Sequence, residues 1–293
     1  MSGWETAVST GAGSALIGLA LLDVFATLFS RGGRRTLSHA LIRSTWIVFR
    51  RLSSRPRVLS LAGPAAFLAV IATWAGALAV GWALVYWPQM PDGFIHSSAL
   101  AEADRSGAVD SVYVSLVTLA TLGYGDITPA EGWLRIATPV EALLGLGLFT
   151  ASVSWLLSIF PVLSRRRALA YEIRLLHESR RAVCEPASPL PAPVYAALTS
   201  RLVAVERDLV TFPVTYYFHE DDHRFALPAA LGHLLELAED GTRPGVAVDV
   251  RLNATALRRA IDDFALGVAE RFHGQAAGST RQVLAAYARD HVT

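Results

Sequence analysis

Three long stretches of the chain are almost wholly apolar, at residues 11–30, 61–87 and 136–163. Asp23 and Glu141 are the charged side chains within them. Each stretch supplies the roughly 20 apolar residues with which a helix crosses a bilayer core of about 30 Å. The pattern therefore predicts three transmembrane helices.

A further apolar stretch, residues 111–120, is too short to span a bilayer, for which a helix needs about 20 residues. It fits a re-entrant helix that enters the membrane and returns as irregular backbone. Irregular backbone persists at membrane depth only where it is buried in protein or lines a water-filled cavity. We therefore expect the residues that follow Ala120 to line a pore.

Beyond residue 164 the chain is more polar, and its apolar positions recur with helical spacing. Asn253 and Ser279 occupy positions where helix N-caps are expected. The segment 164–293 is long enough to form a compact domain with its own core. We expect helices there near residues 194–210, 226–239, 253–272 and 280–291.

Charge sets the expected orientation of the chain. Only 17% of the residues are charged, against about 25% in typical soluble domains. Residues 31–60 contain eight arginines and no acid, and Arg165 to Arg167 follow the last apolar stretch. Cytoplasmic loops of membrane proteins are enriched in basic residues. We therefore expect residues 31–60 and 164–293 in the cytoplasm and the N-terminus outside.

Two features near the first apolar stretch leave alternatives open. Segment 37–52 mixes apolar residues with arginines, which suits either a helix on the inner membrane surface or an ordinary basic linker helix. Asp23 could form an ion pair with Arg31 or Arg34 near that surface, or it could sense protons or ions.

The segment from Thr121 to Gly125 carries the candidate chemistry. Conduction of K⁺ requires oxygen ligands that replace the hydration shell of the ion, and rings of backbone carbonyls supply them. Successive carbonyls point at one axis only if the backbone angles alternate, which Gly123 and Gly125 permit. Tyr124 would point away from the axis, and Asp126 would place a carboxylate at the outer mouth.

This segment resembles the potassium channel signature T-x-x-T-x-G-Y-G-D. Leu122 stands where the family has Val or Ile. The resemblance covers about residues 61–163 and is similar to the bacterial two-helix pore, here with an extra N-terminal helix. It implies four identical subunits around one axis, with ion-binding carbonyls from each chain. The residues that match the signature are Thr118, Thr121, Gly123, Tyr124, Gly125 and Asp126.

Residues of the third apolar stretch are expected to support the filter. Glu141 could accept a hydrogen bond from Thr118 or Ser115 on the short helix, or it could lie in the outer headgroup region. In the family, a glycine near the middle of the inner helix commonly serves as a gating hinge, and Gly145 is the candidate. Close helix packing is the alternative for Gly145 and the favoured role for Gly147.

The cytoplasmic part offers little further chemistry. The cluster His219 to His223 would suit a metal ion, although a solvated helix start is the favoured interpretation. Cys184 is the single cysteine and is expected to be unreactive. No catalytic motif is found, so we expect no enzyme activity, no cofactor, no metal site other than that for K⁺, and no nucleic-acid partner.

The sequence thus predicts an all-α membrane protein with three transmembrane helices, a re-entrant pore helix with a filter loop, and a helical cytoplasmic domain. The predicted function is passive, selective K⁺ conduction by a homotetramer in the plasma membrane of a bacterium, with membrane lipids as surroundings. A weakly selective cation channel and a membrane sensor that signals through its cytoplasmic domain are the alternatives. The predicted divisions are residues 1–30, 31–60, 61–163 and 164–293.

Overall fold

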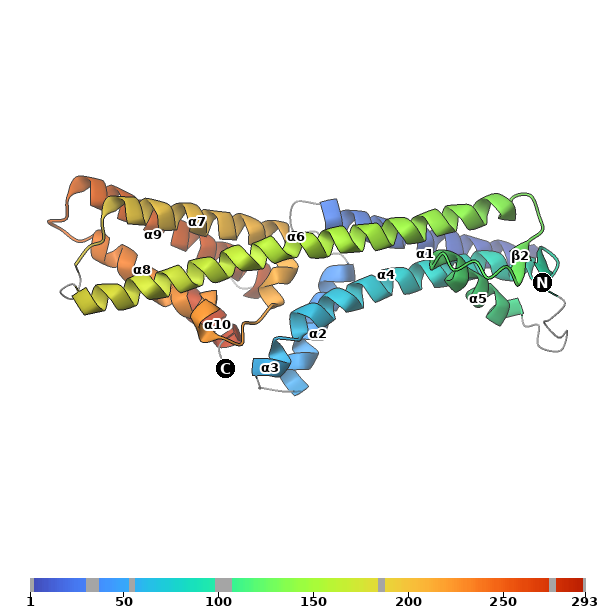
Figure 1. Ribbon diagram of the computed structural model, residues 1–293, viewed down its shortest axis with the longest axis horizontal. Helices are drawn as coiled ribbons and strands as arrows, with labels where there is room; N and C mark the ends of the chain where they lie inside the picture. Colours follow the sequence, from blue (N-terminus) through green and yellow to red (C-terminus); the bar gives the residue numbers. More distant parts are fainter. Residues whose placement is uncertain are drawn as a thin grey trace. The chain divides into compact units, whose positions relative to one another are not determined.

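The computed structural model describes residues 3–29, 37–52, 56–97, 107–183, 188–273 and 278–291, and most of them are helical. Three helices are long and apolar enough to cross a membrane: α1 (Gly3–Phe29), α4 (Ala62–Tyr86) and α6 (Leu134–Val183). They confirm the three long helices predicted from the apolar stretches. α6 differs in length, because it runs on as one helix well beyond residue 163 (Figure 1).

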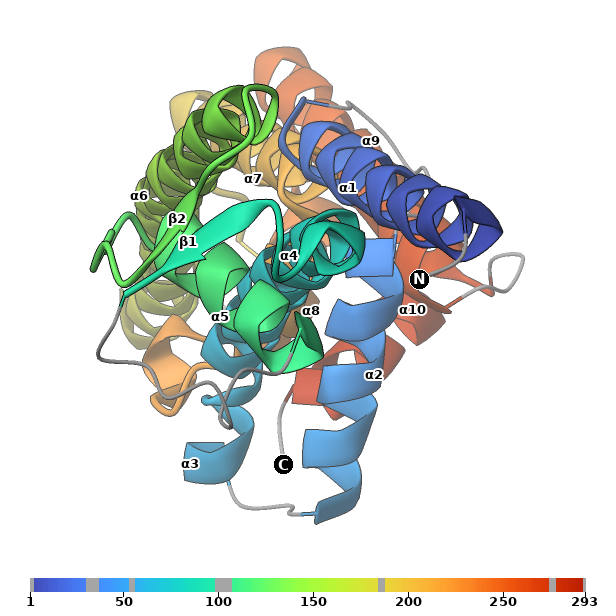
Figure 2. The ribbon, with the colours of Figure 1, turned by 90° about the vertical axis from the view of Figure 1, so that its right-hand side faces the viewer.

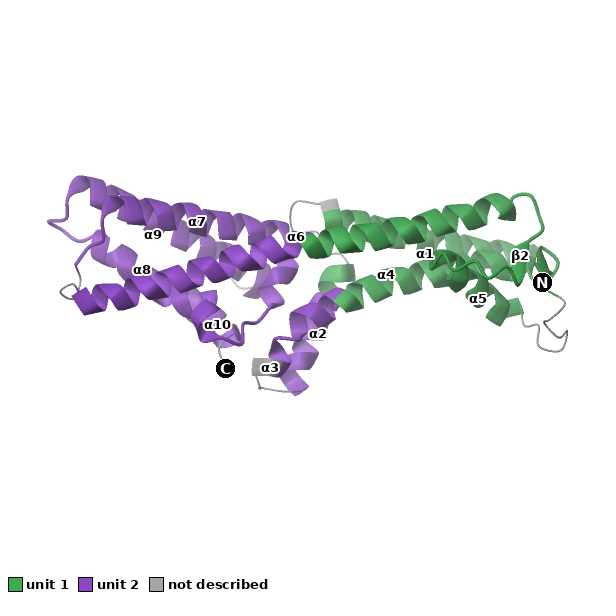
Figure 3. Ribbon diagram, viewed as in Figure 1, with its two compact units in different colours: residues 1–30, 36–40, 68–157 green, residues 31–35, 41–67, 158–293 purple. Residues whose placement is uncertain are grey.

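The chain divides into two compact units (Figure 3). Unit 1 contains residues 1–30, 36–40 and 68–157, and unit 2 contains residues 31–35, 41–67 and 158–293. Residues 41–60 of the basic segment and the first residues of α4 belong to the same unit as the C-terminal helices. The divisions predicted after residues 30, 60 and 163 stay predictions.

In unit 1, α1 packs closely against α4 through glycines. A Cβ atom on Gly13 would lie 2.4 Å from the carbonyl oxygen of Gly81, and one on Gly81 would lie 2.7 Å from Ile17 Cγ1. Ser9 Oγ also donates to the carbonyl oxygen of Leu84 at 2.7 Å. Small residues let helices approach closely in membranes, so these positions fix where α1 meets α4.

Asp23 on α1 accepts hydrogen bonds at the start of α2 (Leu37–Leu52). Its carboxylate accepts from the Leu37 backbone N–H at 2.9 Å and from Ser38 Oγ. Trp74 Nε1 on α4 also donates to it at 2.8 Å. The predicted partners, Arg31 and Arg34, lie outside the described residues. In the described part of the chain, Asp23 is therefore an acceptor for a helix N-terminus, which carries a partial positive charge.

The short helix α5 (Gly107–Leu119) and the strands β1 (Phe94–His96) and β2 (Ile127–Pro129) lie at the same end of unit 1 (Figures 1 and 2). The strands pair antiparallel with Ile95 opposite Thr128. β1 follows the 3₁₀ turn Trp87–Gln89, and β2 begins directly after the loop that carries the candidate filter. The core between these elements and the long helices contains Trp82, Val85, Tyr86, Phe94, Val114, Ile127 and Leu134.

Unit 2 contains α3 (Pro56–Leu59) and a bundle of four helices, α7 (Ala192–Thr211), α8 (Leu227–Gly241), α9 (Val248–Val268) and α10 (Thr280–His291). A π-helical turn at Ala269–His273 extends α9. Leu169 and Ile173 of α6 belong to the bundle core. The four helices predicted beyond residue 164 are confirmed.

One of the two predicted N-caps is correct. Ser279 precedes α10, and its N–H donates to Gln282 Oε1 at 3.0 Å, as in a capping box. Asn253 was wrongly predicted as a cap, because α9 begins at Val248 and Asn253 lies inside it. There Asn253 Nδ2 donates to the carbonyl oxygen of Asp249 at 2.8 Å.

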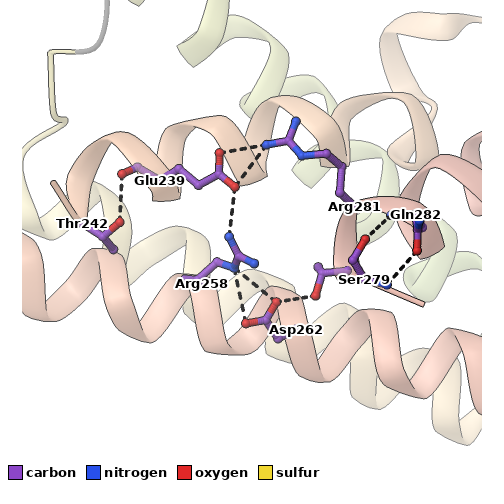
Figure 4. Close-up of polar contacts among 8 residues, drawn as sticks. Glu239, Thr242, Arg258, Asp262, Ser279, Arg281 and Gln282 are labelled. Atoms are coloured by element: carbon purple, nitrogen blue, oxygen red, sulfur yellow. Dashed lines mark hydrogen bonds and ion pairs between the residues drawn. The ribbon is translucent and has the colours of Figure 1, made fainter. Parts of the chain in front are cut away.

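Polar contacts tie α8, α9 and α10 together (Figure 4). Glu239 on α8 accepts from Arg258 on α9 at 3.0 Å and from Arg281 on α10 at 2.9 Å. Asp262 on α9 accepts from Thr280 at 2.6 Å. Exposed ion pairs each contribute about 0–1 kcal/mol, so the network orients the helices more than it stabilises them.

The 213–220 segment, which follows α7 and begins with the 3₁₀ helix Pro213–Tyr217, contacts three other parts of unit 2. Arg166 on α6 is buried and donates to the carbonyl oxygens of Thr215 and Phe218. The Phe218 ring lies 2.6 Å from where a Cβ of Gly63 on α4 would be. The ring of Tyr217 meets that of Trp46 on α2 edge to face, with centroids 5.7 Å apart.

The cluster His219 to His223 is a solvated helix start in its second half, as predicted, but not in its first half. His219 is buried and stacks on His291 with ring centroids 4.8 Å apart. Glu220 pairs with Arg166 and Arg167, whereas Asp222 caps the 3₁₀ helix His223–Phe225. The side chains therefore serve different partners instead of one ion.

We predict that His291 makes unit 2 less stable in mild acid. Burial, followed by the nearby His219, lowers the pKa of His291 to about 3. The unfolded chain binds this proton near pH 6.5, so between pH 6.5 and 3 the unfolded state holds more protons than the folded one. Stability is therefore full above pH 6.5 and falls by up to about 1.4 kcal/mol per pH unit below it.

The midpoint of thermal unfolding at pH 7.5 and at pH 5 measures this effect. His291 Nε2 donates to the carbonyl oxygen of Tyr216 at 2.6 Å, so His291→Gln keeps a donor without the titrating ring. The variant should show a smaller drop between the two pH values than the natural chain. Equal drops would rule out His291 as the source.

Candidate functional site

The end of α5 has the geometry of a Schellman cap. The Thr121 N–H donates to the carbonyl oxygen of Thr118 at 2.9 Å, and the Leu122 N–H donates to that of Val117 at 2.9 Å. In such a cap, the first residue past the cap residue adopts the left-handed region. Here that residue is Thr121, which has φ 55°. Glycine is the usual residue there, and a β-branched residue at positive φ is strained by about 1–3 kcal/mol.

Positive φ angles continue at every second residue of the candidate filter. Gly123 has φ 55° and Gly125 has φ 76°. Among the described residues, Thr121 is the one non-glycine with a positive φ. The sequence predicts this freedom for the two glycines but not for Thr121, because a threonine gives no sign of a left-handed backbone.

A cavity of about 390 Å³ lies between the filter loop, α5 and the start of α6. Thr121, Gly123, Tyr124, Gly125 and Asp126 line it from the loop, with Val117 and Thr138 among the residues that face them. In the single chain Leu122 is 56% exposed and Tyr124 is 67% exposed. The side chains of Leu122 and Tyr124 are therefore largely uncovered in one chain.

Asp126 is held by α5. Tyr113 Oη donates to Asp126 Oδ2 at 2.6 Å, and the backbone carbonyl of Asp126 accepts from the Ser97 N–H at 2.7 Å. These bonds fix the exit of the loop both to α5 and to the residue that follows β1. Tyr113 was not singled out from the sequence, because nothing in its spacing from Asp126 indicates the contact.

Glu141 on α6 is completely buried and joins three helices. Its carboxylate accepts from Ser115 Oγ on α5 at 2.5 Å and from Tyr86 Oη on α4 at 2.7 Å. Of the two expected hydroxyls, Ser115 and Thr118, the structure brings the first to Glu141. The side chain is enclosed by protein on all sides. A buried acid with two hydroxyl donors orients α5 against α4 and α6.

The two glycines of α6 have different surroundings. A Cβ on Gly145 would lie 2.0 Å from the carbonyl oxygen of Leu119, the last residue of α5. Gly145 therefore permits close packing, which was one of its two expected roles. A Cβ on Gly147 would meet no atom within 4 Å in the described chain, so the packing role favoured for Gly147 is not found within one subunit.

Comparison with known proteins finds similarity to ion channels in the part of the chain that contains the filter loop. Residues 77–160 match the model of a family described as "Ion channel". The chain is 26% identical over 220 residues to the uncharacterized membrane protein YdjJ of Bacillus subtilis. The aligned region covers 73% of this chain and 63% of that protein. It is 38% identical over 82 residues to protein LctB of Geobacillus stearothermophilus, which is 26% of this chain and 59% of that protein.

A shorter match reaches a potassium channel. The chain is 41% identical over 46 residues to two-pore potassium channel 5 of Arabidopsis thaliana, which is 16% of this chain and 11% of that protein. No solved structure matches. Together with the three apolar helices, these matches indicate a membrane protein and support an ion channel function for this chain.

Proposed function

We propose that four copies of this chain form a K⁺-selective channel, with the backbone carbonyls of Thr121 to Gly125 as ion ligands. The observation that carries the proposal is the positive φ at Thr121, Gly123 and Gly125 immediately after the short helix α5. A backbone whose angles alternate turns successive carbonyls toward the same side, as a row of K⁺ ligands requires.

The elements around the loop support this role. The C-terminal end of α5 directs its negative dipole end to the point where the loop begins, which favours a cation there. Glu141 fixes α5 to α4 and α6, and Tyr113 holds Asp126 at the loop exit. A partly dehydrated ion would then meet carbonyl groups that are already oriented, and repulsion between neighbouring ions would help each to leave.

The proposed assembly is a homotetramer. One strand cannot surround an ion, and the exposed side chains of Leu122 and Tyr124 provide apolar surface for neighbouring subunits or lipid. With the arginines as the guide to orientation, we place residues 31–60 and 164–293 on the cytoplasmic side of the plasma membrane. The potassium channel named among the matches supports K⁺ as the ion.

Two other functions can be distinguished from K⁺-selective conduction by experiment. A weakly selective cation channel would result if Leu122 loosened the filter, and a membrane sensor would not need to conduct. The alternating backbone conformation of the loop favours conduction over pure sensing, because a sensor does not require oriented carbonyl groups.

Reversal potentials in opposed K⁺ and Na⁺ gradients test the proposal. We expect a potential close to the K⁺ equilibrium value, and Leu122→Val should leave it unchanged because only the Leu122 carbonyl is proposed to touch the ion. A potential near zero would indicate a weakly selective channel. The absence of current from reconstituted, correctly assembled protein would favour the sensor.

A further inference from the structure

Three potential metal ligands come together in unit 2. His177 lies near the end of α6, and His233 and Glu236 lie on α8. One ligand atom from each residue can be chosen so that all three atoms lie within 4.8 Å of one another. His233 and Glu236 are three residues apart on a helix and so share a face. The rings of His177 and His233 stack with centroids 4.0 Å apart.

Each of the two histidines has a ring nitrogen that lacks a hydrogen-bond partner among the described residues. In the described part of the chain, the Nδ1 atoms of His177 and His233 are buried and have no hydrogen-bond partner. Glu236 Oε2 is 3.7 Å from His233 Nδ1, which is too far for a hydrogen bond. Buried polar atoms normally have partners, and one without a partner costs about 1–3 kcal/mol. A bound cation would supply the missing partner to both rings.

A cavity of about 120 Å³ opens beside the rings. A water molecule needs only about 10–15 Å³ of such space, so the water ligands of an ion held by the two rings fit there. Glu236 does not line this cavity and would reach the ion from the other side of His233 along α8. Two arginines line the cavity, but each already has a carboxylate partner. Arg174 pairs with Glu178 at 2.7 Å, and Arg224 pairs with Asp222 at 2.5 Å. The positive charge that opposes a cation is therefore largely compensated.

We propose that His177, His233 and Glu236 bind a divalent transition-metal ion such as Zn²⁺. Two imidazoles and one carboxylate, with a water molecule in the remaining position, form a common tetrahedral ligand set. Ligand bonds of about 2.0–2.2 Å separate the ligand atoms by about 3.4 Å, so modest side-chain rotations close the site. Nitrogen ligands favour transition metals over Mg²⁺ or Ca²⁺, which distinguishes this site from the oxygen-lined filter.

The proposal changes one expectation from the sequence, which was that K⁺ is the only metal ion bound. The ligands could not be grouped from the sequence, because His177 and His233 lie far apart in it and neither belongs to a metal-binding motif. The bound ion would link the end of α6 to α8, and the site does not depend on whether the pore conducts K⁺.

Binding of Co²⁺ to the full-length, tag-free Cys184→Ser chain in detergent tests the site. Tetrahedral Co²⁺ gives strong visible absorption, and Zn²⁺ should displace it because Zn²⁺ binds such ligands more tightly. We expect about one ion per chain. Loss of a group that merely supports a ligand lowers metal affinity by about 10–100-fold, so His177→Ala and His233→Ala should lower it by at least about 100-fold.

Two further variants keep the test decisive. Glu236→Gln alters a half-exposed side chain that should not be needed for folding, and it should weaken binding at least about tenfold. His223→Ala is the matched control, because His223 lines the same cavity but is not one of the three ligands. The proposal is overturned if the natural chain gives no tetrahedral spectrum, if His177→Ala and Glu236→Gln retain it, or if His223→Ala loses it equally.

Discussion

Gly125→Ala is expected to abolish K⁺-selective flux while the chain still inserts into the membrane. Gly125 has φ 76°, and an added Cβ would meet no atom within 4 Å in the chain, so the cost comes from the backbone angle and not from a clash. Such strain costs about 1–3 kcal/mol per site and occurs four times around the axis of a tetramer. The carbonyls should therefore leave their positions. The measurement is the K⁺ flux into liposomes, divided by the amount of protein inserted into the liposome membrane.

Gly132→Ala is the matched control for this substitution. Gly132 follows β2, its φ lies outside the left-handed region, and an added Cβ would also meet no atom within 4 Å. It should conduct as the natural chain does, whereas Gly123→Ala, with φ 55° at the substituted residue, should behave as Gly125→Ala. Normal selective flux through Gly125→Ala would show that the filter assignment is wrong.

The second large effect is expected from Gly145→Ala. The new Cβ would lie 2.0 Å from the carbonyl oxygen of Leu119 and 2.9 Å from its carbonyl carbon. A backbone group cannot rotate away as a side chain can, so α5 and α6 must separate. Overpacking of this kind costs about 1–3 kcal/mol, and contact with backbone puts this site at the upper end. A lower midpoint of thermal unfolding in detergent, with reduced K⁺ flux, is the expected result.

Gly147→Ala on the same helix distinguishes packing from general intolerance. Its Cβ has open space, and alanine stabilises a helix by about 1 kcal/mol relative to glycine. Its unfolding midpoint should equal or exceed that of the natural chain. A hinge role for Gly145 without close packing would instead alter channel opening and leave the midpoint unchanged, and that outcome would contradict the packing assigned here.

The sequence predicted elements whose signal is local. The bounds of α2 and α10 agree with the segments 37–52 and 280–291, because apolar spacing and the Ser279 cap act within a few residues. The start of α9 was misplaced, because its N-cap is Ala247, which offers no side-chain acceptor, so the sequence carries no start signal there.

The candidate site was predictable in its residue types but not in its partners. That the carboxyl groups of Asp23 and Glu141 must be compensated follows from the cost of a charge in a membrane. Which groups compensate them depends on tertiary contacts, and Trp74 and Tyr86 on α4 carry no local sign of that role. For the same reason, the sequence revealed neither the left-handed cap at Thr121 nor the pairing of His177 with His233.

The contacts of the 213–220 segment also determine how this protein can be divided into fragments. A fragment that begins after residue 164 would keep Tyr217 and Phe218 but lose Trp46 and Gly63, against which their rings pack. Two aromatic rings would then be left on its surface. The C-terminal helices would therefore carry an uncovered aromatic patch if they were expressed alone, or exchanged between chimeric channels without α2 and the start of α4.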